Sequence, residues 1–246
     1  MERWERFLLG LQYVLGRIAV VAMAPLCFLF IRLMGYRIRD LKRIRNEVRR
    51  MYRAHEGPWI VCPNHLTMID SLVISYGMAS LAGHILHFRR VPWNLPERKN
   101  FQRNPFLSLL CYLLKCLPVD RGGSREGLQR LLEKCCRVLD WGQGLMIFPE
   151  GGRSRTGRVN RENFSYGVGR FIEECSRCRV MLVYLRGDGQ QTYGTIPRLG
   201  ERFTMTAEVF DPGRAGGGGL RLQREYARRI VERLAALEDA CLASRG

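Results

Sequence analysis

The N-terminal part of the chain is almost continuously apolar from Phe7 to Ile31, and the stretch Ile18–Ile31 carries no charge. A helix over this run would be roughly 37 Å long at about 1.5 Å per residue, which is enough to cross a bilayer. Arg17 lies near its middle, and Pro25 interrupts helical hydrogen bonding. The pattern therefore predicts a broken helical hairpin that lies in one leaflet of a membrane.

Two other kinds of segment would show part of this pattern. A buried core helix is one, but such a helix normally shows a polar stripe that is almost missing here. A cleaved signal peptide is the other, because Ala22-Met23-Ala24 resembles a cleavage site. The apolar run continues past Pro25, however, so the membrane-associated segment is favoured.

A basic collar follows the apolar run. Residues 32–53 include nine basic side chains and two acidic ones, Asp40 and Glu47. Such a collar beside an apolar segment is typical of the cytoplasmic side of a membrane and of contact with anionic headgroups. A solvated helix face is the alternative. We expect a membrane-associated protein on the cytoplasmic face of the inner or cell membrane.

Beyond Gly57, short apolar runs alternate with helical patterns. Ser124 is placed to cap one helix that Gly142 helps to end, and a second apolar face runs from Phe164 to Cys175. This alternation predicts an α/β fold, a single domain with a mixed sheet flanked by helices. The expected strands are Trp59–Cys62, His84–Phe88, Cys116–Val119, Leu145–Phe148, Val180–Leu185 and Phe203–Phe210.

Three segments are expected along the chain. Residues 1–56 form the membrane-associated helices with their collar, and residues 57–215 form the catalytic domain. Residues 216–246 begin with four glycines, Gly216–Gly219, and continue as an amphipathic helix whose apolar stripe includes Ile230 and Leu234. Docking of this helix onto the domain is favoured over a position on the membrane.

Charge and length restrict the function classes. The 246 residues include 40 Lys and Arg against 23 Asp and Glu, a net charge of +17. This charge favours polyanionic partners: nucleic acid, anionic lipid or phosphorylated substrates. No nucleic-acid-binding motif is present, and the apolar N-terminus argues against nucleic acid as the partner. A basic module that binds anionic membranes remains the non-enzymatic alternative.

The cysteines and histidines do not predict a metal site. The nine cysteines form no paired framework, and Cys175-x-x-Cys178 has no second pair to complete a zinc site. His84 and His87 are expected on or beside a strand, where residues three apart point to opposite faces. We therefore interpret the cysteines as reduced thiols and expect no metal.

The segment Pro63–Asp70 carries the most informative chemistry. His65 follows an apolar strand, where a histidine can lie exposed in a cleft. If a helix begins near Thr67, Asp70 lies in its first turn and can reach back to the imidazole, which would then accept a proton from a substrate hydroxyl. Thr67-x-x-Asp70 is also a capping box, in which Asp70 only satisfies the helix N-terminus.

Two more segments follow predicted strands. In Phe148–Ser154, two glycines let the backbone approach a ligand, and Arg153 and Ser154 can bind phosphate oxygens. In Asp120-Arg121-Gly122-Gly123, Arg121 is a second candidate for phosphate binding. Each alone is also compatible with a surface turn or an exposed ion pair.

Together and in this order, the three segments resemble the glycerolipid acyltransferase family, typified by 1-acyl-glycerol-3-phosphate acyltransferases. Asn64-His65-x4-Asp70 is similar to the family's first block and Asp120-Arg121 to its second. Phe148–Ser154 is similar to its third block, and Gly167 also fits. The resemblance covers roughly residues 58–186. Val180–Leu185 lacks the prolines usual in the fourth block, which leaves the acceptor open.

The resemblance implies that His65 is the general base and that Asp70 orients it. It implies no cofactor, only an acyl-CoA or acyl-carrier-protein donor, a phosphorylated lyso-lipid acceptor and membrane lipids as partners. It also implies an N-terminal helix pair that dips into the membrane. The substrate-binding residues that it implies are Asn64, Arg121, Glu150, Gly151, Gly152, Arg153 and Ser154.

The expected activity is therefore O-acyl transfer from a thioester to a lysophospholipid hydroxyl, with 1-acyl-glycerol-3-phosphate as the first choice of acceptor. Glycerol-3-phosphate or a lyso-aminolipid would suit the same residues, and so would transacylation between phospholipids. A serine hydrolase is disfavoured because the chain has no G-x-S-x-G segment.

Overall fold

The computed structural model describes residues 1–101, 103–120, 122–175, 177–213 and 217–243. Its centre is a six-stranded mixed sheet with the strand order β1-β6-β5-β2-β4-β3, in which only β5 and β6 pair antiparallel. The mixed α/β fold predicted from the sequence is confirmed. The strands are β1 (Arg37–Ile38), β2 (Trp59–Pro63), β3 (Trp93–Asn94), β4 (Leu145–Met146), β5 (Arg179–Gly187) and β6 (Arg202–Phe210).

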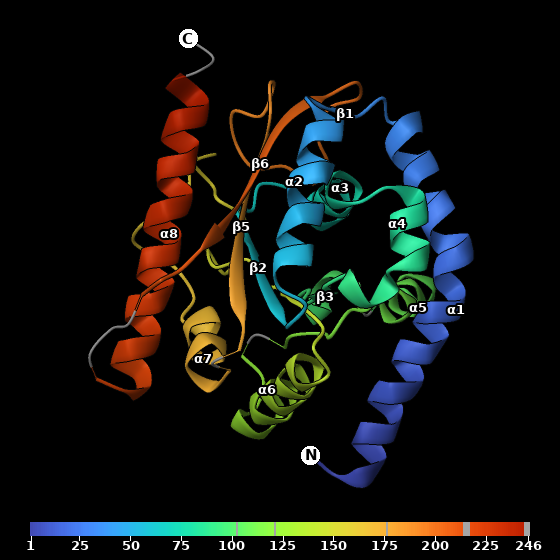
Figure 1. Ribbon diagram of the computed structural model, residues 1–246, viewed down its shortest axis with the longest axis vertical. Coiled ribbons are helices and arrows are strands. Elements are labelled where there is room, and N and C mark those ends of the chain that lie inside the picture. The colour runs from blue at the N-terminus through green and yellow to red at the C-terminus, as the bar shows by residue number, and fades with distance from the viewer. Residues whose placement is uncertain (102, 121, 176, 214–216, 244–246) are drawn as a thin grey trace.

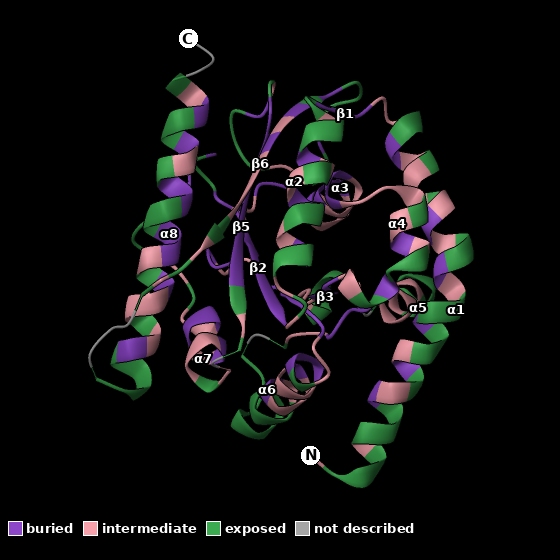
Figure 2. Cartoon of the chain, in the orientation of Figure 1, coloured by how far each residue is buried: buried purple, intermediate pink, exposed green. Residues whose placement is uncertain are grey.

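The central strands carry long apolar runs, Trp59–Pro63 of β2 and Val180–Leu185 of β5, because both faces of the sheet are covered. Ile60 and Cys62 of β2 enter one hydrophobic core, whereas Trp59 and Val61 enter the other. Figure 2 shows β2 and most of β5 buried between the helices. The result is three layers, with a sheet between two helical layers.

Helices α6, α7 and α8 contribute to the first core, and α2 and α3 to the second (Figure 1). Ser124 caps α6 by accepting a hydrogen bond from the Gly127 N–H, and Gly142 follows its end at a φ of 69°, as the sequence predicted. The helices are α1 (Arg3–Leu33), α2 (Leu41–Ala54), α3 (Asp70–Met78), α4 (Leu81–Leu86), α5 (Pro105–Leu113), α6 (Arg125–Asp140), α7 (Gly167–Glu174) and α8 (Gly219–Ala243), with 3₁₀ turns η1 (Phe88–Arg90) and η2 (Arg98–Asn100).

The N-terminal segment is one continuous helix, α1, and the predicted break at Pro25 is wrong. Gln12 and Arg17, two polar residues within the apolar run, bind this helix to the rest of the domain. Gln12 donates from Nε2 to the Tyr112 and Cys116 carbonyls, and Arg17 donates to the Ile85 carbonyl. A Cβ at Gly16 would lie 2.8 Å from the Leu113 carbonyl oxygen, so only glycine permits this close approach to α5.

The outer face of α1 is apolar and exposed. Phe7, Ile18, Leu26 and Leu33 are among the large hydrophobic side chains that lie open on this helix. By length and composition α1 could cross a membrane. In its most apolar stretch of 18 residues, only 22% is buried in the protein. A core helix of a globular domain would be mostly buried.

Two predicted strands differ from the structure, and two observed strands were not predicted. Residues 84–88 are helical, because Ser80 starts α4 by capping the Gly83 N–H; His84 therefore lies on a helix and His87 at its end. Residues 116–119 make only two isolated bridges, to Asn94 and Glu97. Strands β1 and β3 were not predicted, and β1 brings the N-terminal segment into the sheet beside β6.

Candidate active site

The site lies at the carboxyl end of β2, where the chain leaves the centre of the sheet. Asn64 is buried there, and its side-chain amide joins the end of β2 to β5: Oδ1 accepts from the Leu185 N–H at 2.7 Å and Nδ2 donates to the Leu185 carbonyl at 3.0 Å. His65 follows directly. The residue expected to bind substrate thus holds the strand end that carries His65, and its contact with substrate stays a prediction.

Asp70 is the first residue of α3 and contacts the imidazole of His65. Its Oδ2 lies 3.0 Å from His65 Nδ1 and accepts hydrogen bonds from the backbone N–H groups of Leu66 and Thr67 at 2.6 and 2.8 Å. The Thr67 hydroxyl donates to Oδ1. The two N–H groups and the hydroxyl all donate to Asp70, so its carboxyl group is the acceptor of this cluster. If it also accepts from the imidazole, the His65 proton is on Nδ1 and Nε2 is an acceptor.

The helix begins two residues later than the capping-box interpretation requires, which would place the N-cap at Thr67. Its N-cap is Ile69, which makes no side-chain cap, and Asp70 binds the loop before the helix. The side chain of Asp70 is 4% exposed and that of His65 is 20% exposed. A buried carboxylate beside a partly accessible imidazole is the geometry of an oriented general base.

Phe148 lies against the other side of the imidazole. The ring centroids of His65 and Phe148 are 4.1 Å apart, with an angle of 32° between the ring planes. Phe148 follows β4, so the neighbouring strand supplies the surface on which the imidazole rests. Its packing limits the rotation of His65 about the bond to its Cβ.

Glu150 supports the backbone of His65 and does not face solvent. Its Oε1 accepts from the His65 N–H at 2.9 Å, and its Oε2 accepts from the Asn160 N–H at 3.1 Å. Burial raises the pKa of Glu150 to about 7, although both backbone hydrogen bonds act in the opposite direction. Glu150 therefore joins the loop after β4 to residues 64–69, the loop that carries His65.

The remaining residues of the third segment surround the same loop. The Ser154 N–H donates to the His65 carbonyl at 2.9 Å, and the Ser154 hydroxyl donates to the Arg158 carbonyl. Arg153 donates to the Gly194 carbonyl at 2.9 Å and lies beside the Tyr193 ring. Gly151, with a φ of 68°, and Gly152 form the turn between Glu150 and Arg153. Arg121 lies outside the described residues.

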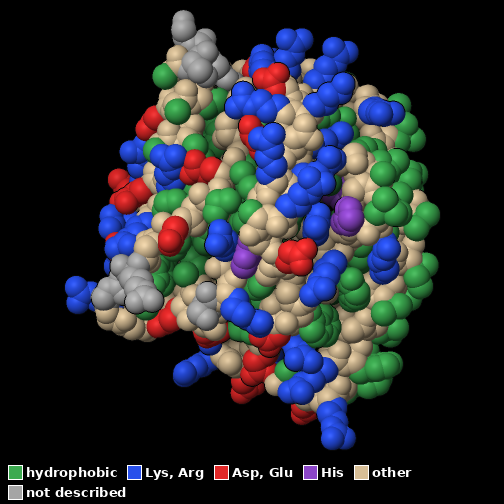
Figure 3. Space-filling view, in the orientation of Figure 1, with side chains coloured by type: hydrophobic (Ala, Val, Ile, Leu, Met, Phe, Trp, Pro, Cys, Tyr) green, Lys and Arg blue, Asp and Glu red, His purple; other side chains and the backbone are tan. Residues whose placement is uncertain are grey.

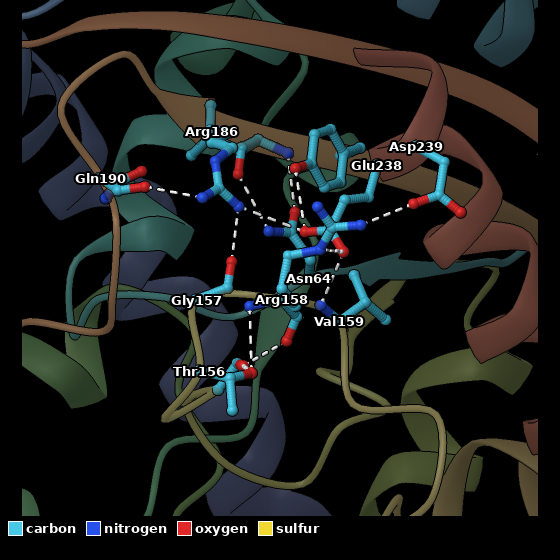
Figure 4. Close-up of polar contacts among 12 residues, drawn as sticks. Asn64, Thr156, Gly157, Arg158, Val159, Arg186, Gln190, Glu238 and Asp239 are labelled. Atoms are coloured by element: carbon cyan, nitrogen blue, oxygen red, sulfur yellow. Dashed lines mark hydrogen bonds and ion pairs between the residues drawn. The ribbon is translucent and has the colours of Figure 1, made fainter. Parts of the chain in front are cut away.

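A buried ionic network continues from this loop to the C-terminal helix (Figure 4). Glu238 of α8 accepts from the Val159 N–H at 3.0 Å and pairs with Arg186 of β5 at 3.3 Å. Arg186 in turn donates to the carbonyls of Gly157 and Gln190. The loop that carries Ser154 and Asn160 is thereby fixed to both the sheet and α8.

An apolar cavity of about 150 Å³ lies next to the first turn of α3. Ser71 and Leu72, the residues after Asp70, line one end, and Ala24 and Phe28 of α1 line one wall. Its lining is mainly apolar, and its other wall comes from β3, β4 and the chain after α5. The cavity connects the neighbourhood of Asp70 with the inner face of α1.

The sequence did not reveal three residues that build this site. Thr67 was recognised only as a possible helix cap, and Phe148 only as the first residue of the third segment, with no contact to His65 expected. Glu238 carried a signal, because it lies four residues after Leu234 and three before Cys241, on the otherwise apolar stripe of α8. A lone acidic residue in such a stripe indicates a buried ion pair.

The fold and the site define an α/β protein in which a buried carboxylate orients an accessible histidine at the end of a central strand. Residues 19–185, more than half of the chain, match the sequence model of the acyltransferase family. The chain belongs to this family, and its general activity is acyl transfer. No curated protein matches the chain.

Proposed function

We propose that this protein transfers a fatty acyl group from acyl-CoA or acyl-carrier protein to the hydroxyl of a lysophospholipid, with 1-acyl-glycerol-3-phosphate as the preferred acceptor. The observation that carries the proposal is the His65–Asp70 pair. No described residue forms a hydrogen bond with His65 Nε2, so this nitrogen can accept a proton from an acceptor hydroxyl. No cofactor enters the reaction.

In the proposed reaction, the acceptor oxygen attacks the thioester carbonyl carbon while its proton passes to Nε2. The carboxylate of Asp70 stabilises the imidazolium that forms, because the two groups share a short buried contact. The C–S bond then breaks, and the leaving thiolate takes the proton from His65. The histidine is restored, and the enzyme is never acylated.

The surrounding residues support binding of an amphiphilic substrate. The apolar cavity would take the fatty chain, since Ser71 and Leu72, the residues after Asp70, line it together with residues of α1. Arg153 lies in the same turn as Ser154, whose backbone contacts His65; it would bind the acceptor phosphate, together with Arg121. Glu150 would act as a positioning residue for the His65 backbone.

The exposed apolar face of α1 supports a membrane location, on the cytoplasmic side that its basic collar favours. Membranes from cells that express the protein should retain it in high salt and release it in detergent, because apolar contact is not screened by ions. Release by salt alone would contradict insertion of α1.

The acceptor and donor can be identified in one experiment. Purified protein in mixed micelles is given labelled acyl-CoA or acyl-carrier protein together with lysophosphatidate, glycerol-3-phosphate or a lyso-aminolipid. Mass spectrometry then identifies the acylated product. We expect phosphatidate from lysophosphatidate as the fastest product. Acylation of a different acceptor alone would replace the proposed substrate, and no product with any acceptor would contradict the proposed function.

A further inference from the structure

A second cavity, of about 410 Å³, lies between α2, the end of α3 and α4. Basic side chains dominate its polar lining: Arg45, Arg49 and Arg53 from α2, and His87 and Arg90 from the end of α4 and η1. Figure 3 shows Lys and Arg side chains gathered over α2, beside the hydrophobic side chains that follow α1. We call this cavity the arginine pocket.

The charge of the arginine pocket is not neutralised by the protein. None of the described residues that line it is acidic. Arg49, Arg53 and Arg90 have no carboxylate partner in the described parts of the chain. Elsewhere the protein pairs such groups: Arg43 of the same helix bonds Glu47 at 2.9 Å. Like charges that converge on one concavity repel one another, so an anion would stabilise them.

Arg45 shows that the pocket is built into the fold. Its guanidinium donates from Nη2 to the Tyr76 carbonyl at 2.8 Å and lies 5.0 Å from the centre of the Tyr76 ring. Its Nε is buried and has no hydrogen-bond partner among the described residues. A buried donor without a partner is costly, so the fold holds the Arg45 side chain at the wall of the pocket at the expense of one hydrogen bond.

None of the residues 64–69 lines the arginine pocket. Its lining includes Ser75 in the middle of α3 and Met78 at its end, whereas Asp70 is the first residue of that helix. The nine residues of α3 place Asp70 and Met78 about 12 Å apart at about 1.5 Å per residue. Arg153, which we assign to the acceptor phosphate, does not line the arginine pocket.

Apolar surface borders the arginine pocket on the side of α1. Leu86 lines the pocket and is 68% exposed. Arg45 also lies over the ring of Phe28, a residue of α1. A ligand with a phosphate next to apolar chains would match both kinds of surface, whereas a small hydrophilic anion would leave Leu86 in contact with water.

We propose that the arginine pocket binds the phosphate headgroup of an anionic phospholipid in the surrounding membrane, with the acyl chains of that lipid along α4 and α1. This site is additional to the acceptor site, and it rests on the proposed membrane location of α1. Arginines bind phosphate oxygens through paired hydrogen bonds, and anionic lipids attract basic segments next to membrane helices. The bound lipid would fix α2 and α4 relative to the membrane surface.

The test uses the full chain in neutral detergent micelles. Dioctanoyl-phosphatidylglycerol is titrated in, and binding is measured as the increase in the melting temperature. The variant Arg49→Gln/Arg53→Gln removes two charges that line the pocket. The matched control Lys42→Gln/Arg50→Gln removes two exposed charges of α2 that do not line it. We expect the affinity to fall about tenfold or more in the first variant and to change less than about twofold in the control.

Three further arms identify the ligand. Dioctanoyl-phosphatidylcholine tests the need for net negative charge, glycerol-1-phosphate tests the headgroup without chains, and coenzyme A tests a soluble phosphate donor. Binding that is strongest for phosphatidylglycerol supports the proposal. An equal loss of affinity in both double variants would indicate general electrostatic attraction and would overturn the assignment of the lipid to the arginine pocket. Tighter binding of glycerol-1-phosphate or coenzyme A would overturn the lipid assignment.

His65→Ala separates this proposal from the acyl-transfer chemistry. This variant should keep the affinity for phosphatidylglycerol, since the arginine pocket does not include His65. Loss of lipid binding in His65→Ala would show that phosphatidylglycerol occupies the acceptor site, and the arginine pocket would then not be the lipid site. Failure of acyl transfer alone would leave the lipid site unaffected.

Discussion

Glu238 of α8 accepts a hydrogen bond from the backbone N–H of Val159, with 3.0 Å between the two atoms. This contact joins the C-terminal helix to the loop whose Asn160 N–H donates to Glu150, and Glu150 in turn holds the His65 N–H. The helix lies beyond the residues that match the acyltransferase family. The loop that carries His65 is thus supported by an element from outside the matched region.

The first prediction concerns this support. Glu238→Gln should lower the free energy of unfolding by about 3 kcal/mol, because it removes the charge opposite buried Arg186. The adjacent variant Asp239→Asn should cost less than about 1 kcal/mol, since its pairs with Arg158 and Arg161 are exposed. Urea unfolding in micelles measures both. Equal effects would show that the buried network does not stabilise the loop.

The second prediction is a pH dependence of stability. The pKa of Glu150 is raised by burial from an ordinary 4.5 to about 7. A raised pKa means that the native state holds this proton more tightly than the unfolded state. Its contribution to stability is complete below pH 4.5 and is lost as the pH rises through 7, a total of about 3 kcal/mol.

Glu150→Gln removes this titration. The free energy of unfolding of the native protein should therefore fall more steeply between about pH 5 and about pH 7 than that of the variant. The variant will also lose one of the two backbone hydrogen bonds at every pH, because an amide has a single oxygen. Parallel pH profiles for the two proteins would show that Glu150 is ionised throughout this range.

The third prediction separates two glycines of α7. A Cβ at Gly169 would lie 1.9 Å from the Gln223 carbonyl oxygen of α8, whereas one at Gly167 would come no closer than 3.6 Å to any atom outside its immediate neighbourhood. Gly169→Ala should therefore cost about 1–3 kcal/mol, and Gly167→Ala less than about 0.5 kcal/mol. Thermal melts of the two variants provide the comparison, and a reversed order would contradict the packing of α7 on α8.

Much of the sheet could be predicted because its strands are continuous apolar runs. Trp59–Cys62 and Val180–Leu185 are buried on both faces, and no polar residue interrupts them. Residues 84–88 are also mainly apolar, but a run of this length fits a helix equally well, and the cap from Ser80 decides between the two. β1 and β3 are two residues long and show no periodicity.

The candidate site could be located from the sequence, but the contacts of its residues could not. The spacing of His65 and Asp70 indicated the pair, and its 3.0 Å contact agrees with that geometry. Glu150 was expected to bind substrate, yet its oxygens contact backbone N–H groups that are distant in sequence. Gln12 and Gly16 interrupt the apolar run, and the run itself does not indicate their contacts with the Tyr112 and Leu113 carbonyls of α5.

The fourth prediction tests whether Asp70 acts through its charge. Asp70→Asn keeps the size of the side chain, and its oxygen can still accept from the Leu66 and Thr67 N–H groups. It cannot stabilise an imidazolium at His65, so the rate of acyl transfer should fall about 10²–10⁴-fold while the fold is retained. A variant that loses stability but keeps its rate per folded molecule would assign Asp70 to loop capping alone.

The measurement that tests the central claim most directly is the rate of acyl transfer by native protein, His65→Ala and the control His55→Ala. His55 follows α2, and its ring packs on Trp59 away from the site. Loss of the general base should lower the rate about 10²–10⁴-fold in His65→Ala, with His55→Ala close to native. Equal rates for native protein and His65→Ala would contradict the account, because the transferred proton would then need a different acceptor.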